Sequence, residues 1–339
     1  MSKKTIYINI GLNKTGSTTL EHTCVNSIKW LNKHNLDYFS KVLFYQHFWG
    51  LYFDSSITTY QLPYLHNLFN YICDTQLPKD NVILIDEDLT LRNPFFKGRL
   101  IRYQTTFGDY HSNFKTIIKN LKYITQDHQL KIIVYIRRQD LFLESLYCQN
   151  IKTRHYFSST FNTFKDIYPP IVLDWLELAT TIENIIGKEN LIIKCFDANH
   201  LKDNDITSDF FSILNCPKPT KTLKSSQKNL RIDAKHFETI RAFRKEKLTI
   251  PPEQYLKSVP SKYCTTGKPY GFLDIKQRQE FLDTFKQSNQ HVSAKYFNNK
   301  PLFSSPNKTL PIINQTSLPQ LSKQKIAQLT TETYPNITI

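Results

Sequence analysis

Residues 6–20 read IYINIGLNKTGSTTL, and they decide the fold class of this chain. The apolar, β-branched run from Ile6 to Ile10 is typical of a buried strand, Gly11 and the polar residues after it of a tight loop, and the segment from Thr18 of a helix. A strand, a loop and a helix in this order bind phosphate groups in α/β proteins, because backbone N–H groups at the helix N-terminus point at the anion. We therefore expect a phosphate-binding loop here.

The lysine of this loop stands at an unusual place. Gly11 and Gly16 have the spacing of GxxxxGK[ST], the loop of nucleotide-binding kinases and GTPases, but Ser17 occupies the position of their lysine. Lys14 lies two residues before the second glycine instead. From the middle of the loop its ammonium group can reach a bridging oxygen of a bound anion, while the N–H groups from Thr15 to Thr19 cradle that anion.

A simpler explanation of the stretch is a helix cap. Thr18 and Glu21 are spaced as a capping box, in which the two side chains satisfy each other's backbone N–H groups. Capping does not explain why Gly11, Lys14 and Gly16 follow a strand together, so we favour the phosphate-binding interpretation.

Further apolar runs of strand length follow along the chain, and helical periodicity fills the intervals between them. This alternation predicts an α/β fold: a mostly parallel, P-loop-like sheet flanked by helices on both faces, with ligands bound at the carboxyl ends of the strands. The further strands are expected at Val82–Ile85, Ile132–Ile136 and Leu191–Cys195, and the helices near 18–32, 62–74, 113–125, 140–152 and 172–186.

The second half of the chain has no further strand pattern and predicts helices near 207–214, 233–246 and 275–298. We expect one domain over residues 1–300, with a sheet core at about 5–196 and a helical cap at about 200–300. Residues 301–339 are rich in Pro, Ser, Thr and Asn, which predicts an extended tail with a short helix at 322–332.

Composition limits the partners. The chain has 44 Lys and Arg against 29 Asp and Glu, a formal charge of +15, which favours an anionic partner such as a nucleic acid, a phosphorylated cofactor or an acidic polysaccharide. No block of five basic residues occurs, so we expect no nucleic-acid partner.

Cysteine and histidine spacing predicts no metal site, since the six cysteines form no CxxC pair and the ten histidines no HxH or HxxxH pair. Isolated cysteines are typical of a reducing compartment, and the sequence shows no leader and no apolar run of membrane-spanning length. We expect a cytoplasmic protein without a transmembrane segment, and leave open a peripheral association with a membrane and the oligomeric state.

The loop resembles a known family. LNKTGSTTL is similar to the 5'-phosphosulfate loop of sulfotransferases that use 3'-phosphoadenosine-5'-phosphosulfate (PAPS), written PK[ST]GT[TS]xL. Asn13 replaces the usual proline and Ser17 a threonine, while the matching residues are Lys14, Thr15, Gly16, Thr18 and Leu20. The resemblance implies that the cofactor is bound by Gly11, Lys14, Thr15, Gly16, Ser17 and Thr18, and is released as 3'-phosphoadenosine-5'-phosphate (PAP).

The family's second signature is an arginine that ends a strand and a serine eight residues later, which together hold the 3'-phosphate. Residues 132–149, IIVYIRRQDLFLESLYCQ, supply Arg137 and Ser145 at this spacing. RRQDxFxESLYxQ also resembles the bacterial, carbohydrate-directed branch of the family. Residues 273–303 resemble the closing helix of the same proteins, and their apolar spacing predicts an amphipathic packing helix without a site residue.

Sulfuryl transfer needs a base for the acceptor and a positive charge at the leaving oxygen, and Lys14 can supply the charge. Residues 82–89, VILIDEDL, place Glu87 where the family often has its base, between Asp86 and Asp88. His47 and His111 are the reserve candidates.

The resemblance implies an enzyme that transfers a sulfuryl group from PAPS to a hydroxyl or amine of a saccharide, such as a bacterial surface polysaccharide or glycolipid. Two alternatives stay open. An apolar run followed by Asp86 and Glu87 is also typical of a magnesium-binding strand in a P-loop kinase, although the usual loop lysine is missing. A non-catalytic nucleotide- or glycan-binding protein is the other alternative.

Overall fold

A computed structural model of the chain describes residues 3–48, 50–51, 61–90, 107–153, 157–168, 170–219, 237, 240–241, 270–306, 312–313 and 315. They belong to two compact units, each described by itself. The first unit comprises Met1–Arg138, Pro170–Leu223 and Thr284–Ser305, and the second comprises Gln139–Pro169, Lys224–Asp283 and Pro306–Ile339. The single domain over 1–300 stays a prediction, and the helix expected at 322–332 lies outside the described residues.

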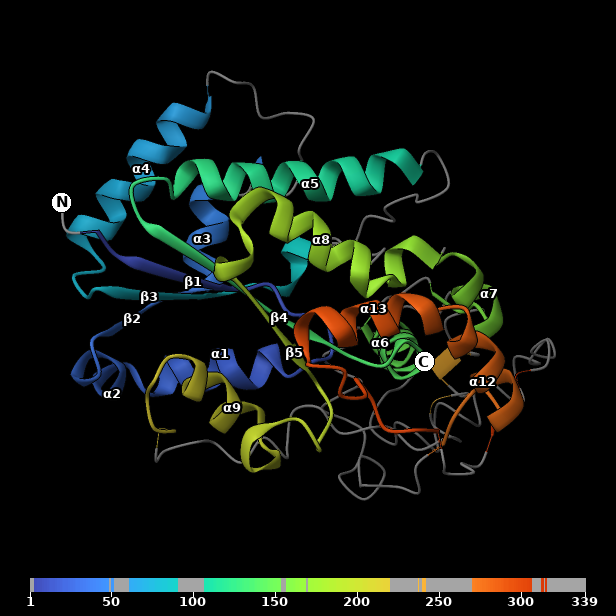
Figure 1. Cartoon of the computed structure of the whole chain (residues 1–339). Helices are drawn as coiled ribbons and strands as arrows, with labels where there is room; N and C mark the ends of the chain where they lie inside the picture. Colours follow the sequence, from blue (N-terminus) through green and yellow to red (C-terminus); the bar gives the residue numbers. More distant parts are fainter. Residues whose placement is uncertain are drawn as a thin grey trace, which may run out of the picture. The chain divides into compact units, whose positions relative to one another are not determined.

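A five-stranded parallel sheet forms the centre of the first unit (Figure 1). Its strands lie in the order β2-β3-β1-β4-β5, and all four pairings are parallel. The predicted α/β class, with a parallel sheet flanked by helices, is confirmed. The strands are β1 (Thr5–Asn9), β2 (Leu36–Phe39), β3 (Asn81–Ile85), β4 (Gln129–Ile136) and β5 (Leu191–Cys195).

The predicted strands are found with shifts of up to three residues at their ends, and β2 is an addition. β1 is the central strand, and its Ile8 lies beside Leu84 of β3 and Ile132 of β4. These three side chains are almost completely buried, because both faces of a parallel sheet are covered by helices.

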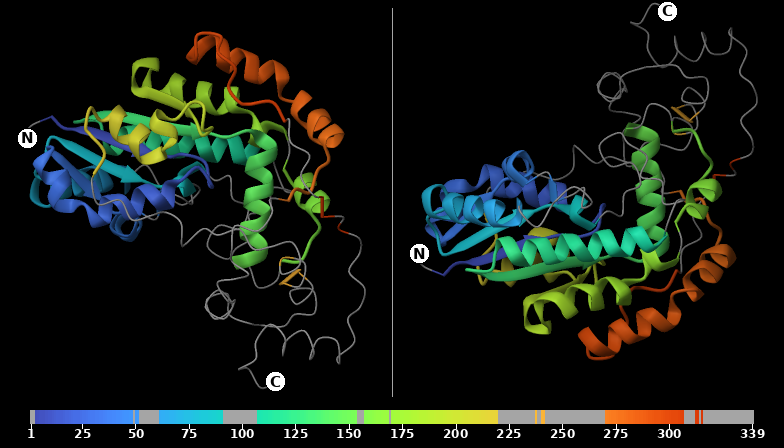
Figure 2. Two further views of the ribbon diagram at one scale, coloured as in Figure 1. Left: turned by 90° about the horizontal axis from the view of Figure 1, so that it is seen from below. Right: turned by 90° about the horizontal axis from the view of Figure 1, so that it is seen from above.

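Helices cover both faces of the sheet (Figures 1 and 2). One layer consists of α1 (Ser17–Asn26), α2 (Ile28–Lys33) and α9 (Ile206–Ile213). The opposite layer consists of α3 (Lys41–Phe48), α4 (Gln61–Thr75), α5 (Phe107–Ile124) and α8 (Trp175–Ile186), and α13 (Lys286–Tyr296) packs against α8. Short 3-10 helices occupy Glu87–Thr90 (η2), Pro170–Leu173 (η4), Lys188–Asn190 (η5) and Lys202–Asn204 (η6).

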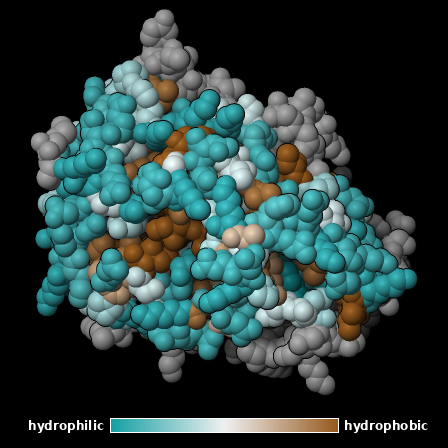
Figure 3. Space-filling model, in the orientation of Figure 1, coloured by the Kyte–Doolittle hydropathy of each residue, from teal (hydrophilic) through white to brown (hydrophobic). Residues whose placement is uncertain are grey.

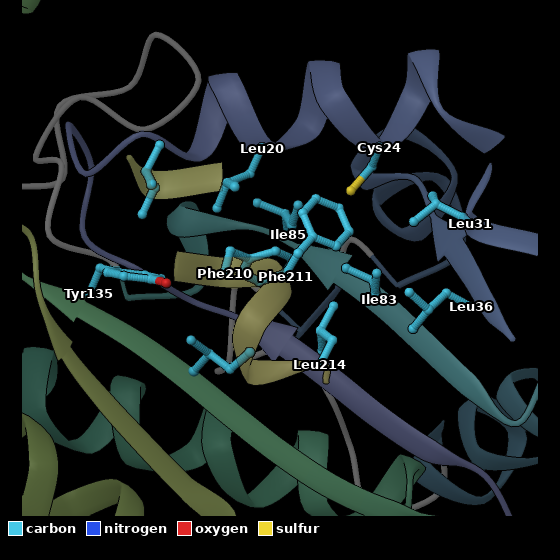
Figure 4. Close-up of a cluster of buried hydrophobic side chains, with 12 residues drawn as sticks. Leu20, Cys24, Leu31, Leu36, Ile83, Ile85, Tyr135, Phe210, Phe211 and Leu214 are labelled. Atoms are coloured by element: carbon cyan, nitrogen blue, oxygen red, sulfur yellow. The ribbon is translucent and has the colours of Figure 1, made fainter. Parts of the chain in front are cut away.

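A cluster of buried apolar side chains fixes α1 and α9 to the sheet (Figure 4). Leu20 and Cys24 of α1 point into it, and Phe210 of α9 meets them from the neighbouring helix. Complete burial of one such leucine or phenylalanine contributes about 1.5–3 kcal/mol. This packing holds the N-terminus of α1, and with it the glycine-containing loop, at one place on the sheet edge.

The second unit is helical and aromatic. It contains α6 (Gln139–Thr153), α7 (Phe161–Asp166) and α12 (Ile275–Asp283). Buried Arg278 of α12 pairs with Asp140 and Glu144 of α6, and its Nη2 atom lies 2.8 Å from Glu144 Oε1. The aromatic rings around Tyr147 belong to Phe157, Phe161, Phe164, Phe237 and Phe272.

The predicted helices at 207–214 and 275–298 are found as α9 and as the pair α12 and α13, and most of the helix predicted at 233–246 lies outside the described residues. None of the described helices is long and apolar enough to cross a membrane. On the face that Figure 3 shows, hydrophilic side chains predominate, and hydrophobic ones form patches between them.

Candidate functional site at the carboxyl edge of the sheet

The loop after β1 stays attached to the sheet as it leaves the strand. Ile10 and Leu12 donate backbone hydrogen bonds to the carbonyls of residues 133 and 135 of β4, at 3.0 and 3.3 Å. Gly11 N donates to the Asn9 side-chain oxygen at 2.9 Å, and a Cβ atom at Gly11 would lie only 2.9 Å from the same oxygen. A side chain at Gly11 would crowd the Asn9 oxygen that accepts this hydrogen bond, so glycine suits this position.

Gly16 ends the loop and begins the helix. Its φ of 88° is left-handed, a conformation that favours glycine, and α1 starts at Ser17 without a side-chain cap. The alternative explanation of this stretch as a capping box of Thr18 and Glu21 does not hold, because Gly16 is the N-cap and Thr18 already lies inside the helix. Within the described part of the chain, the backbone N–H groups of Gly16, Ser17 and Thr18 have no protein acceptor. These donors, at the positive end of the helix dipole, form a cradle suited to an anion.

Lys14 connects the loop to the second predicted motif. Its φ of 70° is also left-handed, and its carbonyl accepts a hydrogen bond of 2.8 Å from Arg137 Nη1. The Arg137 backbone carbonyl in turn accepts a hydrogen bond of 2.9 Å from Trp175 Nε1. The Arg137 guanidinium lies 5.6 Å from the centre of the Phe196 ring. The structure thus brings together two site residues that are 123 positions apart in the sequence.

Two predicted cofactor-binding residues occupy other surroundings. Thr15 uses both its donors within the loop, because its hydroxyl and its backbone N–H bind the Leu12 carbonyl at 2.6 and 3.2 Å. It thereby shapes the loop. Ser145 is half-buried in α6 of the second unit, whereas Arg137 belongs to the first. Joint binding of a 3'-phosphate by Arg137 and Ser145 stays a prediction.

The acidic turn after β3 surrounds a lysine. Lys41 Nζ lies 3.0 Å from Asp86 Oδ1, 3.4 Å from Glu87 Oε2 and 2.9 Å from Asp88 Oδ2. Burial opposes the charge of Lys41, but the carboxylates of Asp86, Glu87 and Asp88 outweigh it and raise the pKa of the ammonium group. No sequence pattern predicted Lys41 here, since it follows β2, the strand that was not predicted.

Glu87, the predicted base, is held less firmly than the two aspartates beside it. Its Oε2 atom is buried and has no hydrogen bond of good geometry in the described part of the chain, although Lys41 Nζ stands within ion-pair distance. Asp86 is completely buried, and its Oδ1 also accepts a hydrogen bond of 3.1 Å from the backbone of Asp88. Asp86 and Asp88 therefore have mainly structural roles around Lys41.

Glu21, on the helix that follows the phosphate loop, interacts electrostatically with the same turn. It lies one turn into α1 and is half-buried. Burial, and then the charge of Glu87, raise the pKa of Glu21 to about 8, and Asp86 and Asp88 add to the rise while Lys41 opposes it. The Glu21 carboxyl is therefore largely protonated at neutral pH.

The reserve histidines have partners of their own. His111 Nδ1 on α5 lies 2.9 Å from Glu177 Oε1 on α8, and Thr181 donates to the same oxygen at 2.9 Å. His47 is exposed on α3 beside the Phe48 ring. Among the described residues, neither histidine forms a hydrogen bond or ion pair with the loop or the acidic turn. Among the described residues, no group of three or more His, Cys, Asp and Glu is arranged to hold a metal ion.

No known sequence family matches the chain. An uncharacterized protein of Archaeoglobus fulgidus is 23% identical over 232 residues, which make up 66% of this chain and 61% of that protein. The chain thus spans less than two thirds of this relative's length. The crystal structure of a sulfotransferase from Alicyclobacillus acidocaldarius is similar over 73% of this chain and 96% of that one, with a TM-score of 0.39 and 10% identity.

Proposed function

We propose that the protein is a sulfotransferase that transfers a sulfuryl group from PAPS to a hydroxyl or amine of a saccharide. The observation that carries the proposal is the hydrogen bond from Arg137 to the Lys14 carbonyl. It joins the two motifs that resemble the family's phosphosulfate loop and 3'-phosphate site. An isolated match of either motif is weak, and a direct contact between them supports both.

The residues of the loop fit an anionic cofactor. The N–H groups of Gly16, Ser17 and Thr18 have no acceptor in the described protein, and the side chain of Lys14 starts from the same loop. In the proposal these groups bind the 5'-phosphosulfate, and Arg137 and Ser145 bind the 3'-phosphate. Gly11 and Thr15 keep the loop in the required conformation.

The bound PAPS supplies the sulfuryl group, and its phosphate oxygen leaves with the electron pair of the S–O bond. The N–H groups of the loop and Lys14 stabilise the negative charge that grows on this oxygen. On the other side, Glu87 accepts the proton of the attacking hydroxyl or amine as the new bond to sulfur forms. The assigned roles are therefore Lys14 for the leaving group and Glu87 for the acceptor.

The position of Lys41 favours this function over a kinase. A P-loop kinase would use the carboxylates after β3 to hold magnesium. Here the ammonium group of Lys41 already lies within 3.4 Å of Asp86, Glu87 and Asp88, where a cation would have to bind. Displacing it would leave a half-buried lysine without its counter-charges.

The saccharide acceptor rests on the resemblance of RRQDxFxESLYxQ to the carbohydrate-directed branch. A bacterial surface polysaccharide or glycolipid and a cytoplasmic location belong to the same proposal. The Tyr-, Phe- and His-rich region 38–75 helps to shape the acceptor site in the same proposal, and its residues 49 and 52–60 lie outside the described residues.

Thermal unfolding with nucleotides tests the cofactor. PAP without magnesium should raise the melting temperature, adenosine 5'-phosphate should raise it less, and ATP with magnesium should have little effect. Stabilisation by ATP with magnesium but not by PAP would indicate a kinase. A screen of glycan acceptors with PAPS, read by mass spectrometry, then tests transfer. Binding of PAP without any sulfated product across the screen would favour the non-catalytic alternative.

A further inference from the structure

Phe196, the residue that directly follows β5, contacts both parts of the proposed cofactor site. Because β5 is paired with β4, Phe196 leaves the sheet edge beside the carboxyl end of β4. Its backbone N–H donates a hydrogen bond of 2.7 Å to the carbonyl of Ile136, the residue before Arg137. The main chain therefore fixes the position from which the Phe196 side chain starts.

The first contact of the Phe196 ring is with the phosphate loop. A Cβ atom at Gly16 would lie 3.3 Å from Phe196 Cε2 and 3.1 Å from Ile206 Cγ1. The two side chains therefore pack directly against the Gly16 backbone, at the point where α1 begins. Because Gly16 has no side chain, the ring comes close to the backbone whose N–H groups form the cradle for an anion.

The second contact of the ring is with the Arg137 guanidinium, whose Cζ atom lies 5.6 Å from the ring centre. At this distance the face of an aromatic ring attracts a cation. Arg137 Nη1 also donates a hydrogen bond of 2.8 Å to the Lys14 carbonyl. An arginine side chain has large rotational freedom, and ordering it costs free energy. Two contacts that already restrict Arg137 reduce the share of this cost that falls on anion binding.

We propose that Phe196 is a positioning residue that holds Arg137 at a fixed place relative to the phosphate loop. This inference rests on the proposed function, in which the loop binds the 5'-phosphosulfate and Arg137 the 3'-phosphate. Because one ring contacts both groups, it fixes the spacing of the two anion sites. Phe196 thereby favours nucleotides with a 5'- and a 3'-phosphate over nucleotides with a 5'-phosphate alone, and it acts on them through Arg137.

The contact can be measured without a nucleotide. In nitrogen NMR of the arginine side chains, the ring current of Phe196 should displace the Arg137 signals, and Phe196→Leu should remove this displacement. Phe297→Leu, the same change at another half-buried phenylalanine, whose ring lies beside His200, is the matched control and should leave the signals unchanged. Unchanged Arg137 signals in folded Phe196→Leu would overturn the inference.

Isothermal titration calorimetry separates positioning from a structural role. Phe196→Leu should weaken PAP binding about 3- to 30-fold, the size of a partly desolvated cation–π contact, and binding of adenosine 5'-phosphate by at most about twofold. Phe196→Tyr keeps the ring and should bind PAP almost as tightly as wild type. Equal losses for the two nucleotides in Phe196→Leu, or the same loss of PAP affinity in Phe196→Tyr, would contradict the inference.

A double variant shows whether the ring acts through the arginine. In a protein that already carries Arg137→Ala, Phe196→Leu should cause no further loss of PAP affinity, and an additive loss would contradict the inference. Equal binding of PAP and adenosine 5'-phosphate by wild type would contradict the proposed 3'-phosphate site and the inference with it. A preference of wild type for PAP that survives in Phe196→Leu would overturn the inference alone.

Discussion

Two turns at the carboxyl edge of the sheet follow neighbouring strands and have opposite character. The loop after β1 carries Lys14, and three of its N–H groups, those of Gly16, Ser17 and Thr18, have no acceptor among the described residues. The turn after β3 presents three carboxylates, and Lys41 lies among them. Since β1 and β3 are paired, the two turns start about 5 Å apart, one strand spacing. The loop after β1 therefore suits an anion, whereas the turn after β3 offers carboxylates that can accept a proton.

The two lysines are therefore not equivalent. Lys41 has raised proton affinity, and its charge is taken up by Asp86, Glu87 and Asp88. Lys14 starts from a loop whose carbonyl is held by Arg137. A lysine that is fixed on carboxylates cannot move to a leaving phosphate without breaking its ion pairs, so Lys41 should not replace Lys14.

The largest effect is expected at the acidic turn. Glu87→Gln should lower kcat by about 10²–10⁴ while PAP binding and fold are kept, because the amide cannot accept the proton. Steady-state kinetics with PAPS, read from the sulfated product, measure kcat. A titration with PAP measures cofactor binding. If Glu87→Gln stays active and His111→Ala or His47→Ala is inactive, a histidine is the base and the acidic turn only holds Lys41.

On the anion side, Lys14→Ala should lower kcat by about 10² or more, equivalent to roughly 3 kcal/mol, with a smaller loss of PAP affinity. The charge of Lys14 is needed most when the leaving oxygen becomes negative. Lys33→Ala removes an exposed lysine of α2 and is the matched control. Near-normal turnover of Lys14→Ala would show that Lys41 or another cation acts on the leaving group.

The contact between the two motifs gives a third prediction. Arg137→Ala should weaken PAP binding about 10- to 100-fold, since a hydrogen bond of a charged group contributes roughly 1.5–3 kcal/mol. The affinity of Arg137→Ala for adenosine 5'-phosphate, which has no 3'-phosphate, should fall less than its affinity for PAP. Isothermal titration calorimetry compares the two nucleotides. Equal binding of both by wild type would exclude a 3'-phosphate site at Arg137.

The smallest effect is on stability. The pKa of Glu21 is raised from 4.5 to about 8 in the folded state, so between these pH values the unfolded state loses a proton that the folded state keeps. Wild type should therefore lose stability relative to Glu21→Gln as pH rises from 4.5 to about 8, by about 1–2 kcal/mol after solvent screening, and no further above that. Urea unfolding of both proteins at pH 4.5, 6 and 9 measures the difference between their free energies of unfolding. If this difference is the same at all three pH values, Glu21 has an ordinary pKa.

Local patterns predicted most of the sheet. Runs such as Ile132–Ile136 are apolar throughout because a parallel strand is buried on both faces, and this pattern is visible in sequence. β2 was not predicted, because it has only four residues, LDYF, and one of them is the aspartate Asp37. Lys41 was missed with it, since its importance depends on where β2 ends.

The sequence by itself determined the order of strand, loop and helix around Lys14, and the spacing of Arg137 and Ser145. Short-range spacing is enough for these features, because a loop and the helix after it follow from neighbouring residues. Only the tertiary structure decided that Gly16 caps α1, that Arg137 holds the Lys14 carbonyl, and that Lys41 and Glu21 join the acidic turn. Contacts between distant segments and shifted pKa values depend on burial and on charges from other elements, which a linear pattern does not contain.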